Sequence, residues 1–268
     1  GDASQILGSL TANGQVWLIN PAGVAFGSGA TVDVSGLVAT TTDISNDDFL
    51  AGSYNFNVGT AERGAIVANS GDINIADGGM LAFVGPGVAN SGVINARFGQ
   101  VALASGDAFA FDLYGDQLIN LTASSQDIAE LTGPDGTSLA ARLVQDGQIK
   151  ADGGHVQLSV NSARSLVDNS INMTGIVQAR SVASQGGSIV LSGGDNGIVS
   201  VTGTLDASGQ EAGEVGGIVK VLGDKVGIFG SAVLDASGDA GGGEILVGGN
   251  MLGQGPEQNA SATVITKD

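Results

Sequence analysis

Residues Val67–Gly71 read VANSG, and the same five residues return as Val88–Gly92. Ile73-Asn74 likewise returns as Ile94-Asn95, so the step from 67 to 88 equals the step from 73 to 94. A repeat of this length, made of Val, Ile and Ala with Gly and Asn between them, is typical of a solenoid of stacked β coils. The sequence therefore predicts a rod with about 21 residues in each coil, enough for three short strands and their corners.

The same offset predicts the register between neighbouring coils. Val67–Gly71 should lie against Val88–Gly92, and Met80–Phe83 against Val101–Ala104, as parallel strands about 4.8 Å apart. Because side chains alternate along a strand, apolar residues should point into the rod while charged residues point outward. The expected inward residues are Ile66, Ile73, Leu81, Phe83, Ile94, Val101 and Leu103, and the expected outward residues are Asp72, Asp77 and Arg97.

The composition favours a thin, regular core. Of the 268 residues 46 are Gly and only 4% are aromatic, which suits narrow coils with tight corners. The net charge of −18 repels phosphate backbones, so we do not expect nucleic acid as a partner. Without cysteine the chain has neither disulfides nor thiolate ligands, and we expect no metal and no cofactor.

Two segments interrupt the repeat. Residues 40–62 carry an acidic run and three aromatic residues, from which we expect a lateral excursion with a short helical turn near Ser45–Ala51 and a hairpin on the flank of the rod. Residues 122–149 are more polar and favour an irregular insertion or distorted coils. Beyond them the coils resume, and Leu205–Gly209 (LDASG) recurs as Leu234–Gly238, a wider step that indicates one coil with a longer loop.

Asparagines recur at equivalent places in the first repeat. Asn69 and Asn90 are one coil apart, as are Asn74 and Asn95. Stacked Asn side chains can hydrogen-bond along a rod and satisfy polar groups at a buried corner. We predict a structural Asn ladder at each of these places, with ligand binding as the alternative.

A tight corner is expected near the beginning of the chain. Asn20-Pro21-Ala22-Gly23 separates the apolar runs 16–19 and 24–26. Asn at the first position, Pro at the second and Gly at the fourth suit a type I turn, and Pro also holds the residue before it extended. The pattern predicts a strand, a corner and a second strand.

Around this corner, Asn13–Gly27 resembles the secretion domain of the filamentous haemagglutinin-like exoproteins of two-partner secretion. The signature of that family has the form N-P-N-G-I. Asn, Pro and Gly match it, Val is a conservative replacement, and Ala departs from the usual Asn. The matching residues in this chain are Asn20, Pro21, Ala22, Gly23 and Val24.

The resemblance implies an all-β fold, a right-handed parallel β-helix with lateral excursions. It implies that residues 1–121 are a truncated two-partner secretion domain beginning after the family's second signature, and that 150–268 are β-helix passenger repeats. It also implies a secreted protein of the bacterial cell surface. The secretion motif, residues 20–24, would be recognised in the unfolded chain by the periplasmic domains of an outer-membrane transporter.

Three functions are compatible with such a rod: a surface adhesin or stalk, a self-assembling extracellular filament of a biofilm matrix, and a carbohydrate-active enzyme. For an enzyme, the candidate carboxylates include Asp206 and Asp235, but the nine basic residues form no catalytic motif and His155 is the single histidine. We therefore predict a non-enzymatic adhesin segment. A host or cell-surface glycan or protein receptor is a further partner open to it, as is a second copy through end-to-end self-association.

Overall fold

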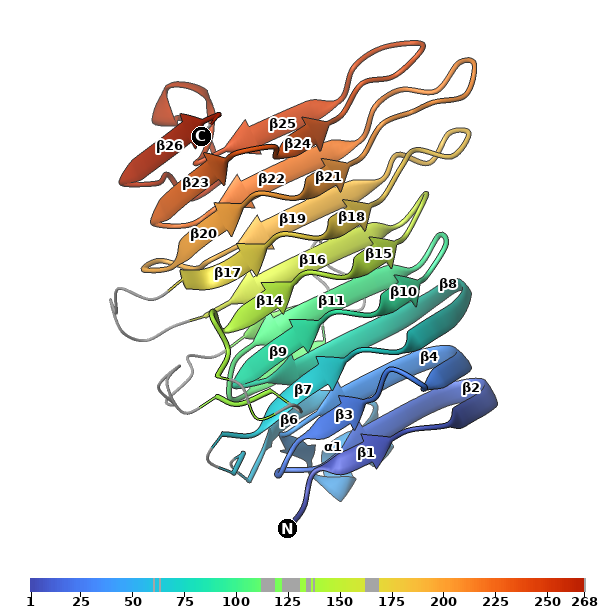
Figure 1. The fold of residues 1–268 in the computed structure, drawn as a ribbon. Coiled ribbons are helices and arrows are strands. Elements are labelled where there is room, and N and C mark those ends of the chain that lie inside the picture. The colour runs from blue at the N-terminus through green and yellow to red at the C-terminus, as the bar shows by residue number, and fades with distance from the viewer. Residues whose placement is uncertain are drawn as a thin grey trace.

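The chain winds into a stack of β coils in the computed structural model, which describes residues 1–59, 61–62, 64–111, 119–121, 131–133, 136, 138–161 and 169–267. Figure 1 shows strands of successive coils lying side by side along the rod, from the N-terminus to the C-terminus. Strands of neighbouring coils pair in parallel, and the fold is the predicted right-handed parallel β-helix. Within the described residues, no helix is long and apolar enough to cross a membrane.

The coils have three faces. The first face consists of β1 (Ser4–Ile6), β3 (Val24–Phe26), β7 (Ile66–Asn69), β9 (Gly87–Asn90), β14 (Leu143–Gln145), β17 (Asn169–Met173), β20 (Ile198–Val201), β23 (Lys225–Phe229) and β26 (Ala262–Thr266). The second consists of β10 (Val93–Asn95), β15 (Gln148–Lys150), β18 (Ile176–Gln178), β21 (Thr204–Asp206) and β24 (Val233–Asp235). The third consists of β11 (Gln100–Ser105), β16 (His155–Val160), β19 (Ser188–Ser192), β22 (Ile218–Leu222) and β25 (Glu244–Val247). In the first coils these last two faces are joined in the long strands β2 (Ser9–Ile19), β4 (Thr31–Thr40) and β8 (Asp72–Gly85).

The offset of the VANSG repeat is confirmed as one coil on the first two faces. β7 pairs with β9 so that Val67 lies opposite Val88, and β8 pairs with β10 at the same offset. On the third face the predicted register was wrong by one residue, because Val101 lies opposite Leu81 and not Met80. This shift keeps Val101 and Leu81 both in the core, whereas the predicted pairing would have turned one of them outward.

Most other coils are longer than this first repeat. Leu143, Ile171 and Val199 occupy equivalent places in β14, β17 and β20, and both of these steps exceed the step from Val67 to Val88. The LDASG repeat is confirmed as one coil, since Leu205 lies opposite Leu234. Between Ile171 and Val199 the extra residues lie in the loops that join β18 to β19 and β19 to β20, so coil length varies while the stacking of the strands does not.

Glycines form the corner between the first and second faces. A Cβ atom on Gly92, Gly147, Gly175 or Gly203 would overlap the carbonyl oxygen of the glycine one coil earlier. That carbonyl instead accepts a hydrogen bond from the residue after the glycine, as in the 2.9 Å bond from the Gln148 N–H to the Gly92 oxygen. The corner before the third face is built in the same way by Gly99, Gly154, Gly217 and Gly243.

The interior of the rod is one cluster of buried apolar side chains from all three faces. Ile66 was predicted inward but lies outside it, buried instead against Leu131 on the outer side of β7. Its neighbour Val67 takes the inward place, because side chains alternate along the strand. The other predicted inward residues are in the core, and Asp72, Asp77 and Arg97 are exposed as predicted.

A lateral sheet covers the flank of the first coils; the excursion predicted at residues 40–62 contributes part of it, and residues 109–111 and 119–121 contribute the rest. Its antiparallel strands lie in the order β13 (Ile119–Leu121), β12 (Phe109–Phe111), β6 (Asn55–Val58) and β5 (Asp43–Ile44). The helix α1 (Asn46–Ala51) follows β5, and the Ser45 hydroxyl caps it by accepting a bond from the Asp48 N–H. Trp17 of β2 contacts Phe49 and Tyr54 at ring-centroid distances of 5.3 and 5.4 Å, which ties the excursion to the rod.

A charge placed in the interior should unfold neighbouring coils. Leu103 is fully buried, so Leu103→Asp buries an unpaired carboxylate, and we expect it to lower the free energy of unfolding by more than about 4 kcal/mol. Gln100→Asp, at the exposed start of the same strand, is the control and should cost less than about 1 kcal/mol. Urea unfolding of both variants measures the difference, and equal midpoints would contradict the assignment of Leu103 to the core.

Candidate functional site

The candidate secretion motif, residues 20–24, forms the predicted tight corner between β2 and β3. The Gly23 N–H donates to the Asn20 carbonyl oxygen at 2.9 Å, which closes a four-residue turn. The Ala22 N–H donates to the side-chain Oδ1 of Asn20, also at 2.9 Å. Pro21 is exposed at the tip of the corner, while Asn20 and Ala22 are half-buried.

The side chain of Asn20 fastens the first strand to this corner. Its Nδ2 donates to the carbonyl oxygen of Asp2 and to the hydroxyl of Ser4, each at 3.0 Å. The Asn20 backbone N–H donates to the Thr40 carbonyl oxygen at 3.0 Å, which joins the corner to the end of β4. Both polar atoms of the carboxamide are therefore engaged within the folded chain.

Gly23 and Val24 set the next coil against the corner. Gly23 has φ +112°, a conformation that side chains disfavour, and a Cβ there would lie 2.9 Å from the carbonyl oxygen of Ile66. Val24 is buried and begins β3, which pairs with β1 on one side and β7 on the other. The corner thus depends on residues that come much later in the chain, since Val24 pairs with Val67.

The asparagines predicted as ladders contact one another. Asn69 donates from Nδ2 to the Oδ1 of Asn90 at 2.8 Å, and both side chains are buried. Asn95 donates in the same way to Asn74 at 2.9 Å, on a half-buried outer surface. Sequence reasoning missed Gln145, whose Oε1 accepts from Asn90 at 2.8 Å and so extends the buried ladder by one coil.

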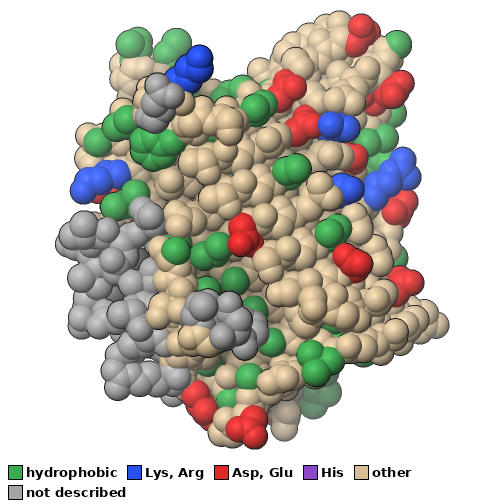
Figure 2. Space-filling model, viewed as in Figure 1, with side chains coloured by type: hydrophobic (Ala, Val, Ile, Leu, Met, Phe, Trp, Pro, Cys, Tyr) green, Lys and Arg blue, Asp and Glu red, His purple; other side chains and the backbone are tan. Residues whose placement is uncertain are grey.

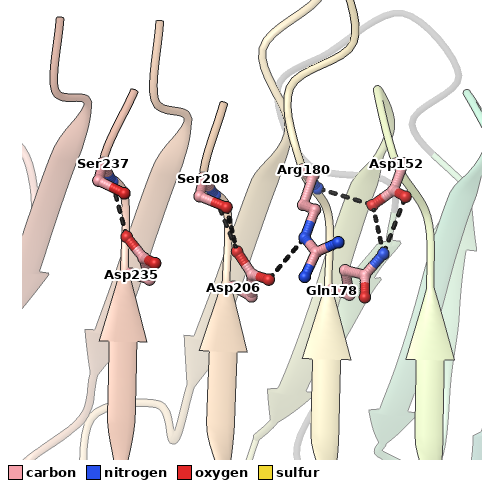
Figure 3. Close-up of polar contacts among 7 residues, drawn as sticks. All are labelled: Asp152, Gln178, Arg180, Asp206, Ser208, Asp235 and Ser237. Atoms are coloured by element: carbon pink, nitrogen blue, oxygen red, sulfur yellow. Dashed lines mark hydrogen bonds and ion pairs between the residues drawn. The ribbon is translucent and has the colours of Figure 1, made fainter. Parts of the chain in front are cut away.

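The carboxylates considered for an enzyme belong to a polar column along the second face, which Figure 3 shows. Asp206 accepts bonds from the Arg180 Nε at 2.7 Å and from the Ser208 N–H and hydroxyl. Asp235, one coil on, accepts from the Ser237 N–H at 2.8 Å. Each carboxylate thus fixes the turn after its own strand.

Electrostatics support the same structural role. Burial would raise the pKa of Asp206, but the hydrogen bonds from Ser208 and the nearby Arg180 guanidinium outweigh it and hold the pKa below its ordinary value. Such a carboxylate stays ionised at neutral pH and is a poor proton donor. In the part of the chain that the structure describes, no group of three or more acidic or histidine side chains is placed to hold a metal ion.

Comparison with known proteins identifies the family. The model of the TPS secretion domain, the domain of two-partner secretion, matches residues 1–217. The chain belongs to this family. The crystal structure of the HMW1 secretion domain from Haemophilus influenzae superposes with a TM-score of 0.79 and 31% sequence identity, over 99% of this chain and 66% of that one.

Two curated relatives are heme/hemopexin-binding proteins of Haemophilus influenzae. One, from strain Rd, is 31% identical over 202 residues, and the other is 29% identical over 211 residues. The alignments cover 73% and 72% of this chain but only 21% of either relative, so the chain spans about a fifth of their length. Neither relative is named as an enzyme.

Family membership places the protein outside the cell. TPS exoproteins are secreted across the outer membrane to the cell surface or the extracellular space, with an outer-membrane transporter as the partner. The corner at Asn20 is therefore part of an exported β-helix.

Removing the middle of the buried ladder should destabilise the rod. Asn90→Leu removes two buried hydrogen bonds, the one with Asn69 and the one with Gln145. We expect a loss of about 2–4 kcal/mol in the free energy of unfolding. Asn95→Leu breaks only the half-buried pair with Asn74 and should cost less than about 1 kcal/mol. Denaturant titration compares the two, and an equal or larger loss for Asn95→Leu would contradict a structural ladder at Asn90.

Acid should remove the contribution of Asp206. Because its pKa is lowered in the folded chain, its stabilisation is complete above the unfolded value of about 3.9 and is lost as pH falls through the folded value. Asp206→Asn should therefore be less stable than the parent at pH 7, and the difference should shrink below about pH 4. Thermal melts from pH 7 down to pH 3 measure it, and a constant difference would show that ionisation of Asp206 does not matter.

Proposed function

We propose that the chain is an exported segment of a surface adhesin or stalk, and that the corner at residues 20–24 is the determinant its transporter recognises. The observation that carries the proposal is the Asn20 corner, where the family's signature coincides with a turn joining β1, β3 and β4. An unfolded chain presents Asn20 and Pro21 freely, whereas the folded rod engages the carboxamide of Asn20. Recognition in the periplasm would therefore precede folding outside the cell.

The fold supports export in an unfolded form. Each coil pairs mainly with the coils beside it, so folding can start at one end and propagate along the rod. The corner helps to start this process because Asn20 binds the first strand and Gly23 receives the next coil. One set of residues would then serve transporter recognition first and coil formation afterwards.

The adhesin role rests on the shape and surface of the rod. The curated relatives are named for binding heme and hemopexin, and the HMW1 chain is named as a secretion domain, so neither name supplies a ligand for this chain. On the face drawn in Figure 2, acidic side chains are dispersed among uncharged ones, as expected of a solvated stalk. A receptor for the rod, end-to-end assembly into a matrix filament, and the passage to passenger repeats near residues 122–149 stay predictions.

Secretion of variants tests the motif. Asn20→Ala and Pro21→Ala in the full-length precursor should abolish its appearance outside the cell, without reducing synthesis, in a strain that makes the partner transporter. Ala22→Asn should be tolerated, since Asn suits this position of a turn. Quantitative immunoblots of medium, periplasm and cells measure the distribution.

A control separates recognition from folding. Ser4→Ala removes a hydrogen-bond partner of Asn20 but leaves the motif intact, so this variant should be exported even where the purified rod is less stable. Normal export of Asn20→Ala would show that residues 20–24 form only a structural corner of the rod and are not a secretion signal. Loss of export in Ser4→Ala as well would assign the effect to folding.

A further inference from the structure

A groove lies on the outer side of the third face, beyond the end of the lateral sheet. Its volume is about 520 Å³. The floor is formed by β16, β19 and β22, which Figure 1 shows as successive strands of the rod. One wall is β13 of the lateral sheet, and the other is the segment Pro256–Gln258 near the end of the chain.

The floor of this groove is a sheet face of mixed character. Val190 and Ile218 present aliphatic side chains to the groove. Ser188 and Ser192, which flank Val190 on β19, present hydroxyls. The alternate residues of the same strands point into the core, as Ile189 does. Such a face suits an extended peptide, because every second side chain of the peptide points toward the same face.

The wall made by β13 is the edge of a sheet. Among the strands of the lateral sheet that the structure describes, β13 is the terminal one, paired with β12 on one side. On the groove side, the carboxamide of Gln157 accepts a bond from the Ile119 N–H at 3.4 Å and donates one to the Ile119 carbonyl oxygen at 3.1 Å. Asn161 donates to the carbonyl oxygen of Leu121 at 3.1 Å. Side chains of the rod thus stand where the backbone of a further strand would pair.

The opposite wall is held in place. Lys220 of β22 and Glu257 form an ion pair at 2.5 Å, and Gln258 donates from Nε2 to the Gly194 carbonyl oxygen at 3.2 Å. These two contacts hold the segment Pro256–Gln258 against the rod before anything binds. A preformed groove lowers the entropy lost on binding.

The lateral sheet ends partway across this face. Towards the N-terminus its strands bury the outer side of the rod, where Phe109 and Ile119 pack with Ala102 and Ala104. The groove continues the same face over β19 and β22. A strand added beside β13 would therefore cover the floor as β12 and β13 cover the coils before it.

We propose that this groove binds an extended basic peptide segment of a partner protein, added as a strand to β13. Main-chain hydrogen bonds to Ile119 and Leu121 would replace those of Gln157 and Asn161, which is the usual mode of strand addition to a sheet edge. Asp195 lines the groove beside the Lys220–Glu257 ion pair, and the chain carries a net charge of −18, so basic side chains on the peptide are favoured.

The two charged groups of the floor do not oppose a basic peptide strongly. His155 has its pKa lowered by burial and by the charge of Lys220, so it is neutral at pH 7. Lys220 is neutralised by Glu257. Small-molecule sites are mostly enclosed and apolar or aromatic, whereas this groove is open and no Phe, Tyr or Trp is among the described residues that line it.

A synthetic peptide of five Thr-Lys repeats is the probe, because it favours an extended chain and carries basic residues on one side. Fluorescence anisotropy with the labelled peptide and the purified chain should show saturable binding. N-methylation of every residue, which removes the N–H donors of both edges of the peptide, should weaken binding by about tenfold or more. Equal affinity for the methylated peptide, or no binding at millimolar protein, would overturn the proposal.

Variants of the chain locate the site. Val190→Arg fills the floor and should weaken binding by about tenfold or more, while Ile176→Arg adds the same charge to an exposed position on β18 and should leave affinity unchanged. Gln157→Leu and Asn161→Ala free the edge of β13 and should each raise affinity a few-fold. Circular dichroism confirms that the variants fold. Weaker binding by both edge variants, or equal effects of the two arginines, would also overturn strand addition at β13.

Discussion

The close approach of backbones at the glycine corners is the constraint on which the rod depends. A Cβ on Gly92, Gly147, Gly175 or Gly203 would overlap the carbonyl oxygen of the glycine one coil earlier, and each of those carbonyls accepts a hydrogen bond from the coil that follows it. The coils, and with them the apolar side chains of the interior, are therefore stacked at a fixed spacing. Loops of different length can be inserted elsewhere because they do not disturb this stacking.

The corner at Asn20 obeys the same constraint with different chemistry. Gly23 leaves room for the carbonyl of Ile66, and the carboxamide of Asn20 supplies the hydrogen bonds that secure β1. Once β1 and the turn are in place, the polar atoms of this side chain are engaged. Under the proposed function, the transporter reads this segment before folding, when the carboxamide of Asn20 is free; in the rod that carboxamide is engaged, while Pro21 stays exposed.

Much of the fold follows from the sequence because neighbouring coils repeat each other. The VANSG repeat predicted the pairing of β7 with β9, and the recurring Asn predicted contacts that the structure contains. Gln145 was missed because 55 residues separate it from Asn90, which hides the shared Gly two positions later at Gly92 and Gly147. The glycine that recurs at this corner would have identified Gln145, because Gln145 precedes Gly147 by two residues as Asn90 precedes Gly92.

Other features depend on contacts that no local pattern records. The register of β11 is shifted by one residue because the corner within β8 is longer, and Ile66 is buried from outside by Leu131. The edge of β13 meets Gln157 across 38 residues of sequence. Periodicity fixes which residues form a coil, but packing between distant segments decides what covers it.

Binding to the periplasmic domains of the partner transporter tests the central claim most directly. A synthetic peptide of residues 13–27 represents the unfolded motif, and the purified folded chain represents the rod. The account predicts that the peptide binds, that its Asn20→Ala form does not, and that the folded chain fails to compete with it. Competition by the folded chain as strong as that of the peptide would contradict recognition before folding.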